Sequence, residues 1–259
     1  MLFEQFYIKN LRQLFDNEGF NNFESLWSYS GKWVEPINER RGGWSGVCRL
    51  EIPDTSVPHF FLKRQENHNT KSFRHPFKGI PTYRREVNNI LRFKKYNIAT
   101  LDLAYYGERK HQNKHQAILI SRALEDFEPL EEWIAKANES QLNEMLKKLA
   151  HTIRHMHSHG LMHMYLNSSS IFVRKTKKSL LERSIIDIRI IDLESVRIQP
   201  ISMKRRFKDL RYMLEHIHAL SHQNFVYFLE LYFNSKPNFF GADTLHSRLS
   251  THLDRLARK

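Results

Sequence analysis

The chain has 259 residues, of which 41% are hydrophobic, so it is long enough for one large domain or for two lobes around a shared cleft. It carries 41 Lys and Arg against 28 Asp and Glu, and the resulting net charge of +13 favours an anionic partner. No run of about 18 apolar residues predicts a membrane span, and the start of the chain lacks the pattern of a secretory signal. The single cysteine, Cys48, excludes an intrachain disulfide and fits a reducing compartment, so we expect a cytoplasmic protein.

The first part of the chain is expected to begin as helix and to continue as strands. Residues 1–30 look helical, with breaks at Gly19 and near residues 28–31. The segments "GVCRLEI" (46–52) and "HFFLKRQ" (59–65) are short and apolar, and "PDTSVP" lies between them, which predicts a hairpin.

A helix and a second strand pair follow the hairpin. Apolar residues in "TYRREVNNILRFKKY" (82–96) recur at helical spacing. "LAYYGER" (103–109) and "QAILISR" (116–122) predict the next two strands.

The second half of the chain is expected to be mainly helical. "LEEWIAKAN" and "SQLNEMLKKLAHTIRHMHSHG" have helical patterns, and Gly160 is a suitable residue to end the second helix. "SIFVRK" and "IRIIDLE" predict two short strands with Asp187 in the turn between them, and helix resumes at about Met203. This order predicts an α+β protein with a strand-rich lobe over 1–124 and a helical lobe over 125–259, as in the protein kinase fold.

Three features of the first lobe fall where that fold binds nucleotide. "RGGWSG" (41–46) contains Gly42, Gly43, Ser45 and Gly46, and glycines let a backbone approach phosphates, although an ordinary glycine hairpin has the same composition. Lys63 follows an apolar strand and either extends to solvent or neutralises phosphates. Glu86, the one acid of the following helix, either pairs with a surface arginine or with Lys63.

Two features of the second lobe match the catalytic elements of that fold. "HMYLNSSSIF" (163–172) aligns with the kinase pattern H-R-D-L-x-x-x-N, with His163 in register, Tyr165 at the Asp position and Ser170 at the Asn position. We expect His163 to hold the loop in shape, while Tyr165, a phenol that stays protonated at neutral pH, is no carboxylate base. Asp192, in "IIDLES", matches the metal-binding Asp that follows a strand, and Ser170 is the candidate second metal ligand.

The histidines of "HTIRHMHSHGLMH" do not predict a metal centre. They lack the H-E-x-x-H spacing, and no partner cysteines are present. Histidines near the end of a helix also interact favourably with its dipole.

The whole of residues 20–235 resembles the InaA family, within the bacterial lipopolysaccharide core kinases that include Kdo and heptose kinases. The resemblance lies in "GGWSGVCRLE", "FLKRQENH", "RHPFKGIPTYRREVNNILRFKKYNI", "AILISRALEDFEPLEEW", "IIDLESVR" and "RRFKDL". It implies a kinase-like fold that uses ATP and Mg²⁺ to phosphorylate a lipopolysaccharide core sugar. In that case the segment Gly42–Gly46 covers the phosphates, Lys63 and Glu86 pair beside them, Asp192 binds metal, and Asp209 braces the loop.

Tyr165 and Ser170 depart from the kinase pattern, and they leave two alternatives open. Base assistance contributes roughly 10²- to 10⁴-fold, so a slow phosphotransferase without the Asp is possible. A nucleotide-binding pseudokinase with a regulatory or scaffolding role is the second hypothesis. A basic nucleic-acid-binding protein is the third, which only the charge favours, since no Arg-rich tail, zinc-finger spacing or RNP motif is present. For a kinase, the charge suits an anionic glycolipid acceptor and a peripheral position at the inner face of the inner membrane.

Overall fold

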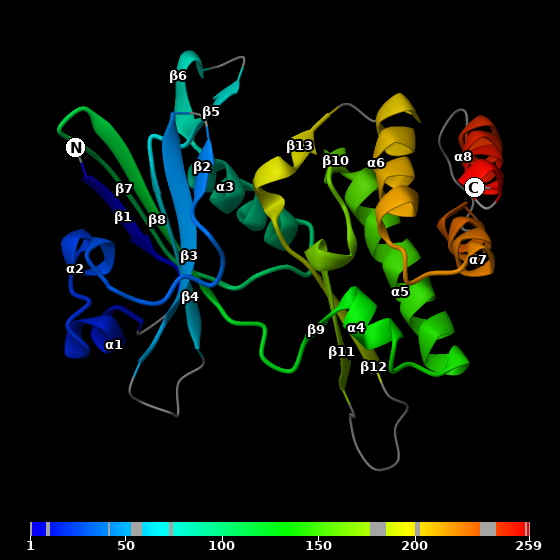
Figure 1. Ribbon diagram of the computed structural model, residues 1–259, viewed down its shortest axis with the longest axis horizontal. Helices are drawn as coiled ribbons and strands as arrows, with labels where there is room; N and C mark the ends of the chain where they lie inside the picture. The colour runs from blue at the N-terminus through cyan, green and yellow to red at the C-terminus, as the bar shows by residue number, and fades with distance from the viewer. Residues whose placement is uncertain are drawn as a thin grey trace. The chain divides into compact units, whose positions relative to one another are not determined.

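The structure is a computed structural model that describes residues 2–8, 11–40, 42–52, 59–72, 75–176, 185–199, 203–233, 242–256 and 258. The chain forms two compact units. Unit 1 comprises Met1–Arg92 and Leu101–Glu125, and unit 2 comprises Phe93–Thr100 and Asp126–Lys259. Unit 1 is rich in strands and unit 2 in helices (Figure 1), so the predicted α+β class is confirmed. Within the described ranges, no helix is both long and apolar enough to cross a membrane.

Unit 1 contains an antiparallel sheet in the strand order β1-β7-β8-β4-β3-β2. Its strands are β1 (Leu2–Phe6), β2 (Asn38–Arg40), β3 (Gly43–Leu50), β4 (Phe60–Glu66), β7 (Leu103–His111) and β8 (Lys114–Arg122). Both predicted strand pairs are confirmed, since Cys48 of β3 lies opposite Leu62 of β4 and Tyr106 of β7 lies opposite Leu119 of β8. The predicted turn "PDTSVP" lies outside the described residues.

The start of the chain is not the helix that we predicted over residues 1–30. Leu2 to Phe6 form β1, which pairs with β7 at the edge of the sheet, and the helices among the described residues of this segment are α1 (Leu11–Asn17) and α2 (Phe23–Trp27). A segment of five residues is too short for its apolar spacing to separate a helix from a strand. Hydrogen bonding to the free edge of β7 satisfies its backbone and decides the outcome.

Alternation along β4 sends successive side chains to opposite faces of the sheet. On one face, Leu62 joins a buried apolar cluster with Phe23 of α2. On the other face lies α3 (Thr82–Lys95), where the Gln65 Oε1 atom accepts a hydrogen bond from the Tyr83 backbone N–H at 2.8 Å. The predicted helix is therefore confirmed, and the odd-numbered polar residues of β4 face it.

A hairpin that the sequence did not reveal precedes α3. It consists of β5 (Asn69–Ser72) and β6 (His75–Pro81), a separate two-stranded sheet in which Thr70 lies opposite Ile80. Proline and glycine inside a strand ordinarily argue against it, and β6 contains both Pro76 and Gly79. A free two-stranded hairpin tolerates them because its outer edge needs no further donors.

Unit 2 combines small sheets with helices. Its elements are β9 (Glu128–Pro129), α4 (Leu130–Ile134), α5 (Glu139–Ser158), β10 (Leu161–Met162), the 3₁₀ turn η1 (Ser168–Ser170), β11 (Ile171–Thr176), β12 (Ile185–Ile190), η2 (Leu193–Ser195), β13 (Arg197–Ile198), α6 (Met203–His216), α7 (His222–Phe233) and α8 (Ala242–Leu256). The strands pair in the orders β12-β11-β9 and β10-β13. Figure 1 shows α5 running beside α6 and α7, and α8 beside α7.

Helix α5 is the central helix of unit 2, and capping residues fix both of its ends. Asn138 and Gln141 form a reciprocal capping box at its start. Its last turn leads into Gly160, whose φ of +69° is the left-handed conformation that favours glycine after a helix. The predicted end at Gly160 is thus confirmed.

Asp187 does not lie in a hairpin turn as we predicted. It is in the middle of β12, opposite Arg174 of β11, and its carboxylate lies 3.2 Å from the Arg174 guanidinium group. The charged cross-strand pair lets an Asp occupy a strand position that its propensity alone disfavours.

Candidate active site

The first part of the candidate site is an ion pair inside unit 1. The Lys63 Nζ atom lies 2.7 Å from the Glu86 Oε1 atom, so the predicted pairing of these two residues is confirmed. The pairing follows from the geometry of a strand and of a helix. Side chains alternate between the two faces of β4, which points Lys63 toward α3, and the helical repeat of α3 places Glu86 on the face that carries Tyr83 and Ile90.

Burial determines what this pair can do. The Glu86 side chain is only 1% exposed, and a carboxylate at such a position requires a cation or hydrogen-bond donors. The Lys63 side chain remains 17% exposed, so its ammonium group can be reached from solvent. An external anion can therefore reach Lys63 while Glu86 holds the ammonium group in place.

The glycine segment was predicted to be a loop over residues 41–46, but most of it belongs to the hairpin of β2 and β3. Gly43, Ser45 and Gly46 all lie in β3, Gly42 lies in the turn with a φ of +76°, and Arg41 is outside the described residues. A side chain at Gly43 would collide with the backbone of residues 66–68. Packing thus requires this glycine, and Gly42 alone is in a turn that could approach a phosphate.

The loop between β10 and β11 in unit 2 is built around Asp209 of α6. Its two carboxylate oxygens accept hydrogen bonds from the backbone N–H groups of His163, at 2.8 Å, and Met164, at 2.7 Å. Met164 has a φ of +75°, which is strained for a residue with a side chain, and the bond from its N–H group stabilises that conformation. Asp209 therefore braces the loop, as the sequence resemblance implied.

A buried histidine and tyrosine complete the environment of Asp209. The His157 Nε2 atom of α5 donates to the Asp209 carboxylate at 3.0 Å, and the His157 Nδ1 atom lies 2.8 Å from the Tyr232 hydroxyl of α7. Burial raises the pKa of Tyr232 to about 12, so the phenol stays protonated and donates to His157. Burial alone would raise the pKa of Asp209, but hydrogen bonds and charge from His157 and His163 outweigh it and lower that pKa.

The same loop is joined to the segment that carries Asp192. The His163 Nε2 atom donates to the Ile191 carbonyl oxygen at 2.9 Å, and the Ile191 N–H group donates to the Ser170 carbonyl oxygen at 2.9 Å. Asp192 comes next, exposed, with a left-handed backbone (φ 60°, ψ 46°) and without a capping bond from its side chain. An exposed carboxylate that does not cap the turn after it is available to bind a cation.

The polar residues at the end of the loop bond with one another. The Asn167 Oδ1 atom accepts from the Ser170 N–H group at 3.0 Å and from the Ser170 hydroxyl at 2.9 Å, which caps the 3₁₀ turn. Ser170 is 2% exposed. Its hydroxyl therefore contributes to the shape of the loop.

Tyr165, by contrast, extends out of the loop. It is 55% exposed, and its ring meets the Tyr212 ring edge-on with the centroids 5.4 Å apart. Tyr212 in turn stacks on His216 with the centroids 3.8 Å apart. Among the described residues the Tyr165 hydroxyl has no hydrogen-bond partner, so the side chain does not support the fold through that group.

Comparison with known proteins gives the family. The model of the lipopolysaccharide kinase (Kdo/WaaP) family matches residues 24–232, which contain the Lys63–Glu86 pair, the loop and Asp209. The chain belongs to this family. It is also 28% identical over 160 residues to Protein InaA of Escherichia coli (strain K12), a match that covers 60% of this chain and 72% of InaA. The predicted InaA-type membership is confirmed.

The fold is also that of a solved lipopolysaccharide kinase. The structure of WaaP in complex with acyl carrier protein matches with a TM-score of 0.64 at 18% identity, covering 98% of this chain and 99% of that chain. At this identity the match shows the fold alone, and it confirms the kinase-like fold predicted from the sequence.

Two residues of this candidate site escaped the sequence analysis. His157 was considered only as one of several clustered histidines, and Tyr232 was not considered at all. The signal for His157 was its position on the buried face of α5 beside Ile153 and Met156, where a polar side chain needs a partner. Tyr232 lies 75 positions further along the chain, and its pairing with His157 is visible only once α5 and α7 pack together.

Proposed function

We propose that this protein is an ATP-dependent phosphotransferase of the lipopolysaccharide kinase type that phosphorylates a sugar of the lipopolysaccharide core. The observation that carries the proposal is the buried Lys63–Glu86 pair at 2.7 Å in a chain of a kinase family. A lysine held by a buried glutamate on an adjacent helix is a positioned cation for a triphosphate, and phosphoryl transfer depends chiefly on positioning and charge neutralisation.

The division of roles follows the two parts of the chain. In the part over 1–124, Lys63 neutralises phosphate charge, Glu86 positions it, and the Gly42 turn, with Gly43, Ser45 and Gly46 behind it, covers the phosphates. In the part over 125–259, Asp192 binds the metal.

The donor set fits a magnesium ion. Asp192 offers a hard, exposed carboxylate of the kind that Mg²⁺ prefers, and its side chain is not used to cap the turn that follows. When bound, the ion would neutralise phosphate charge. Ser170 is a poorer ligand than the sequence suggested, because its hydroxyl is buried and bonded to Asn167, so we assign the metal to Asp192.

His163 and Tyr165 have different roles in the proposed reaction. His163 is a positioning residue that fixes the loop through its bonds to Asp209 and Ile191. Tyr165 is exposed and directs a phenol, a donor and acceptor, to solvent, where it can hydrogen-bond an acceptor hydroxyl. Without a carboxylate base, transfer is expected to be slower by roughly 10²- to 10⁴-fold than with one.

We propose an anionic glycolipid as the acceptor and a cytoplasmic protein that associates peripherally with the inner face of the inner membrane. The net charge of +13 supports both, since it attracts anionic lipid surfaces and phosphorylated saccharides. Vesicle sedimentation tests this location: binding to anionic vesicles that falls with added salt supports it, and equal binding to neutral vesicles contradicts it.

Nucleotide binding is tested first, by the melting temperature with and without ATP and Mg²⁺. The wild type is expected to gain stability by mass action, and Asp192→Asn is expected to lose the part that depends on Mg²⁺. Asparagine adopts the left-handed conformation readily, so the variant keeps its fold. The matched control is Asp187→Asn, which removes an acid of the same unit. Equal shifts in wild type and Asp192→Asn would refute the assignment of the metal.

Transfer is then tested with labelled ATP and isolated core oligosaccharide. Wild-type transfer that Asp192→Asn abolishes supports the kinase, and Tyr165→Asp, an exposed substitution, is expected to raise the rate. The second candidate function, a nucleotide-binding pseudokinase, is favoured by the exposed tyrosine at the position of the catalytic Asp. ATP binding without any transfer by wild type would support that candidate and contradict the first.

A further inference from the structure

A second concave site lies within unit 1, separate from the ion pair. It has a volume of about 1320 Å³ and is formed by the β5–β6 hairpin, the turn between β7 and β8, the end of β4 and the Gly42 turn. Neither Lys63 nor Glu86 lines it. We call it the basic groove, defined by Lys71, Lys78 and Lys110 among its lining residues.

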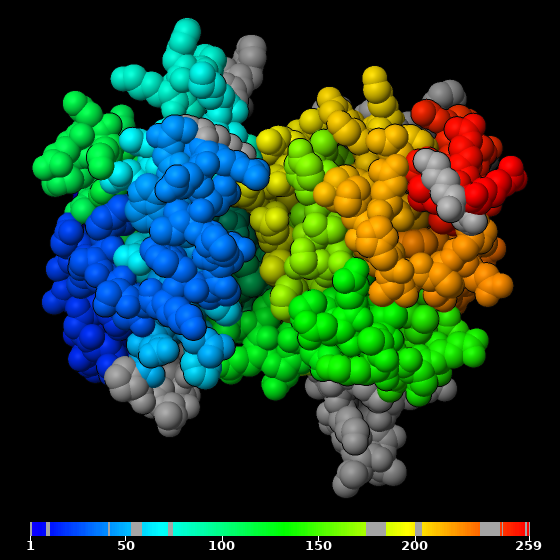
Figure 2. Space-filling view, in the orientation of Figure 1, coloured from blue at the N-terminus to red at the C-terminus, as the bar shows by residue number. Residues whose placement is uncertain are grey.

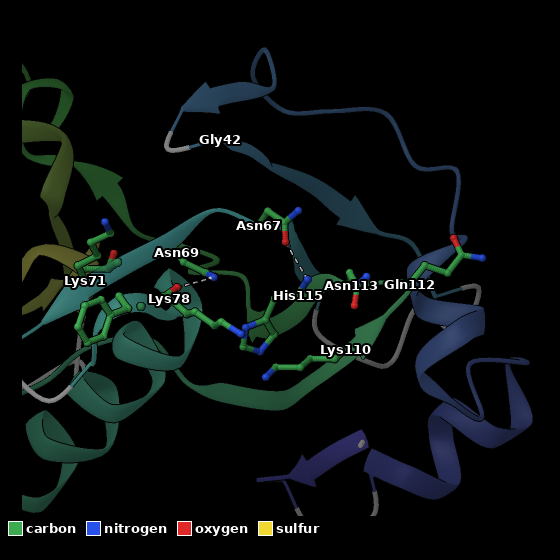
Figure 3. Close-up of a pocket in the computed structure, with 12 residues that line it drawn as sticks. Gly42, Asn67, Asn69, Lys71, Lys78, Lys110, Gln112, Asn113 and His115 are labelled. Atoms are coloured by element: carbon green, nitrogen blue, oxygen red, sulfur yellow. Dashed lines mark hydrogen bonds between the residues drawn. The ribbon is translucent and has the colours of Figure 1, made fainter.

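The basic groove has a one-sided charge. Three lysines line it, and none of the described residues that line it is acidic. Two carboxylates on the strands that border the groove are already paired: Glu66 of β4 lies 2.9 Å from the Lys114 ammonium group, and Glu108 of β7 is bonded to Arg84. Figure 3 shows the side chains of Lys78 and Lys110 extending toward His115 in the centre of the groove. An anion in the groove would meet uncompensated positive charge.

Side-chain amides hold the walls of the groove. The Asn67 Oδ1 atom accepts from the His115 N–H group at 2.8 Å, and the Asn69 Nδ2 atom donates to the Lys78 carbonyl oxygen at 3.1 Å (Figure 3). Gly79, at a φ of +65°, lets β6 approach the Thr70 carbonyl closely. The first bond fixes the end of β4 to β8, and the second joins the two strands of the hairpin. The Gln65 Nε2 atom of β4 donates to the His68 carbonyl oxygen next to β5 at 2.8 Å, so the groove is formed before a ligand binds.

An aromatic ring stands at the same hairpin. Phe77 lines the groove and is 87% exposed, although a phenylalanine ordinarily loses stability by facing water. In Figure 2 the cyan β5–β6 hairpin projects beyond the strands of unit 1 that carry it. The ring is therefore available to a ligand that enters the groove.

We propose that the basic groove, which shares the Gly42 turn but neither Lys63 nor Glu86 with the proposed nucleotide site, binds the phosphate-bearing part of a saccharide. Its volume exceeds that needed for one phosphate group and accommodates several sugar rings. Lysines bind phosphates as point charges, the amides of Gln112 and Asn113 offer donors and acceptors for hydroxyl groups, and Phe77 offers a face for a sugar ring. The choice of a saccharide rests on the proposed function, whereas the anion specificity rests on the groove itself.

Calorimetric binding of deacylated core oligosaccharide, with its phosphates intact or removed by hydrofluoric acid, tests this site. The groove variant carries Lys71→Gln, Lys78→Gln and Lys110→Gln. The matched control carries Lys32→Gln, Lys147→Gln and Lys148→Gln, which are exposed and remove the same charge. The groove variant is expected to bind the phosphorylated oligosaccharide about tenfold more weakly than the control.

Two further arms identify the ligand chemistry. Wild type is expected to bind the dephosphorylated oligosaccharide about tenfold more weakly than the phosphorylated one, and the groove variant is expected to lose this preference. Phe77→Ser is expected to weaken binding of both forms. Equal affinity of groove variant and control, or equal affinity of wild type for both oligosaccharides, would overturn the proposal.

The remaining outcomes separate this proposal from its alternatives. A groove variant that loses binding to anionic phosphatidylglycerol vesicles but not to oligosaccharide would assign the groove to a lipid surface and overturn the saccharide. The groove variant should keep the stabilisation by ATP and Mg²⁺. If wild type never transfers phosphate while oligosaccharide binding depends on the three lysines, the proposed function fails and the groove assignment stands.

Discussion

Replacing Asp209 by alanine should destabilise the protein far more than replacing an exposed aspartate with the same kind of partner. Asp209 is 1% exposed and accepts bonds from the His157 ring and from two backbone N–H groups of the loop. A hydrogen bond to a charged group contributes about 1.5–3 kcal/mol, and Asp209 accepts three, so its removal costs on the order of 4.5–9 kcal/mol before water or relaxation compensates. We therefore expect a loss of at least about 4 kcal/mol.

The matched control for this prediction is Asp254→Ala. The Asp254 carboxylate lies 3.1 Å from the His222 Nε2 atom, but these side chains are 56% and 39% exposed. An exposed pair contributes less than about 1 kcal/mol. The two variants thus remove the same chemical contact at opposite extremes of burial.

Urea unfolding and thermal melting measure the difference. For a protein of this size, 1 kcal/mol corresponds to roughly 2–4 °C, so Asp209→Ala should melt about 10 °C or more below wild type and Asp254→Ala within about 3 °C of it. Asp209→Asn keeps the shape and one acceptor, and it should fall between them. Losses within 1 kcal/mol of each other for Asp209→Ala and Asp254→Ala would refute the argument that Asp209 holds the loop.

Three further predictions concern stability. Lys63→Met should cost about 3–5 kcal/mol because it leaves the Glu86 carboxylate buried without a cation, and adding Glu86→Gln should restore most of the loss in urea unfolding; a double variant no better than the single one would contradict this account. Gly46→Ala should cost about 1–3 kcal/mol, because the new carbon would lie 2.8 Å from the Trp33 ring, and an unchanged urea midpoint would count against it. The folded pKa of Asp209 lies below its ordinary value of 3.8, so its contribution to stability is complete above about pH 4 and is lost as the pH falls through the folded pKa. Across this acid range the free energy of unfolding should fall more steeply with decreasing pH for wild type than for Asp209→Asn. Parallel pH dependences of the two proteins would argue against the lowered pKa of Asp209.

Sequence periodicity identified the parts of the site that depend on regular elements. Lys63 and Glu86 are 23 positions apart, and a strand period followed by a helix period is sufficient to bring them together. The glycine segment was harder to interpret, because Gly43 and Gly46 are required by close packing, and a phosphate loop has the same composition. Sequence composition does not distinguish these two causes.

The environment of Asp209 depends on contacts between distant segments and could not be derived from local pattern. Its loop partners lie more than 40 positions earlier, and the Tyr232 hydroxyl reaches the network from another helix. The resemblance to a family predicted that Asp209 braces the loop. No local sequence pattern predicted that the buried His157 would lie between Asp209 and Tyr232. Strand β1 was missed for a related reason, since its structure depends on a free edge contributed by β7.

The hydrogen bonds that hold the loop between β10 and β11 do not involve the Tyr165 side chain. The bonds that hold the loop pass through the backbone of His163 and Met164, the His163 ring and Asp209. Tyr165 stands outside that frame and faces water. Because those bonds do not use the Tyr165 side chain, replacing it by a carboxylate residue is expected to leave the stability almost unchanged, so the frame of the loop and the residue at this position can vary independently.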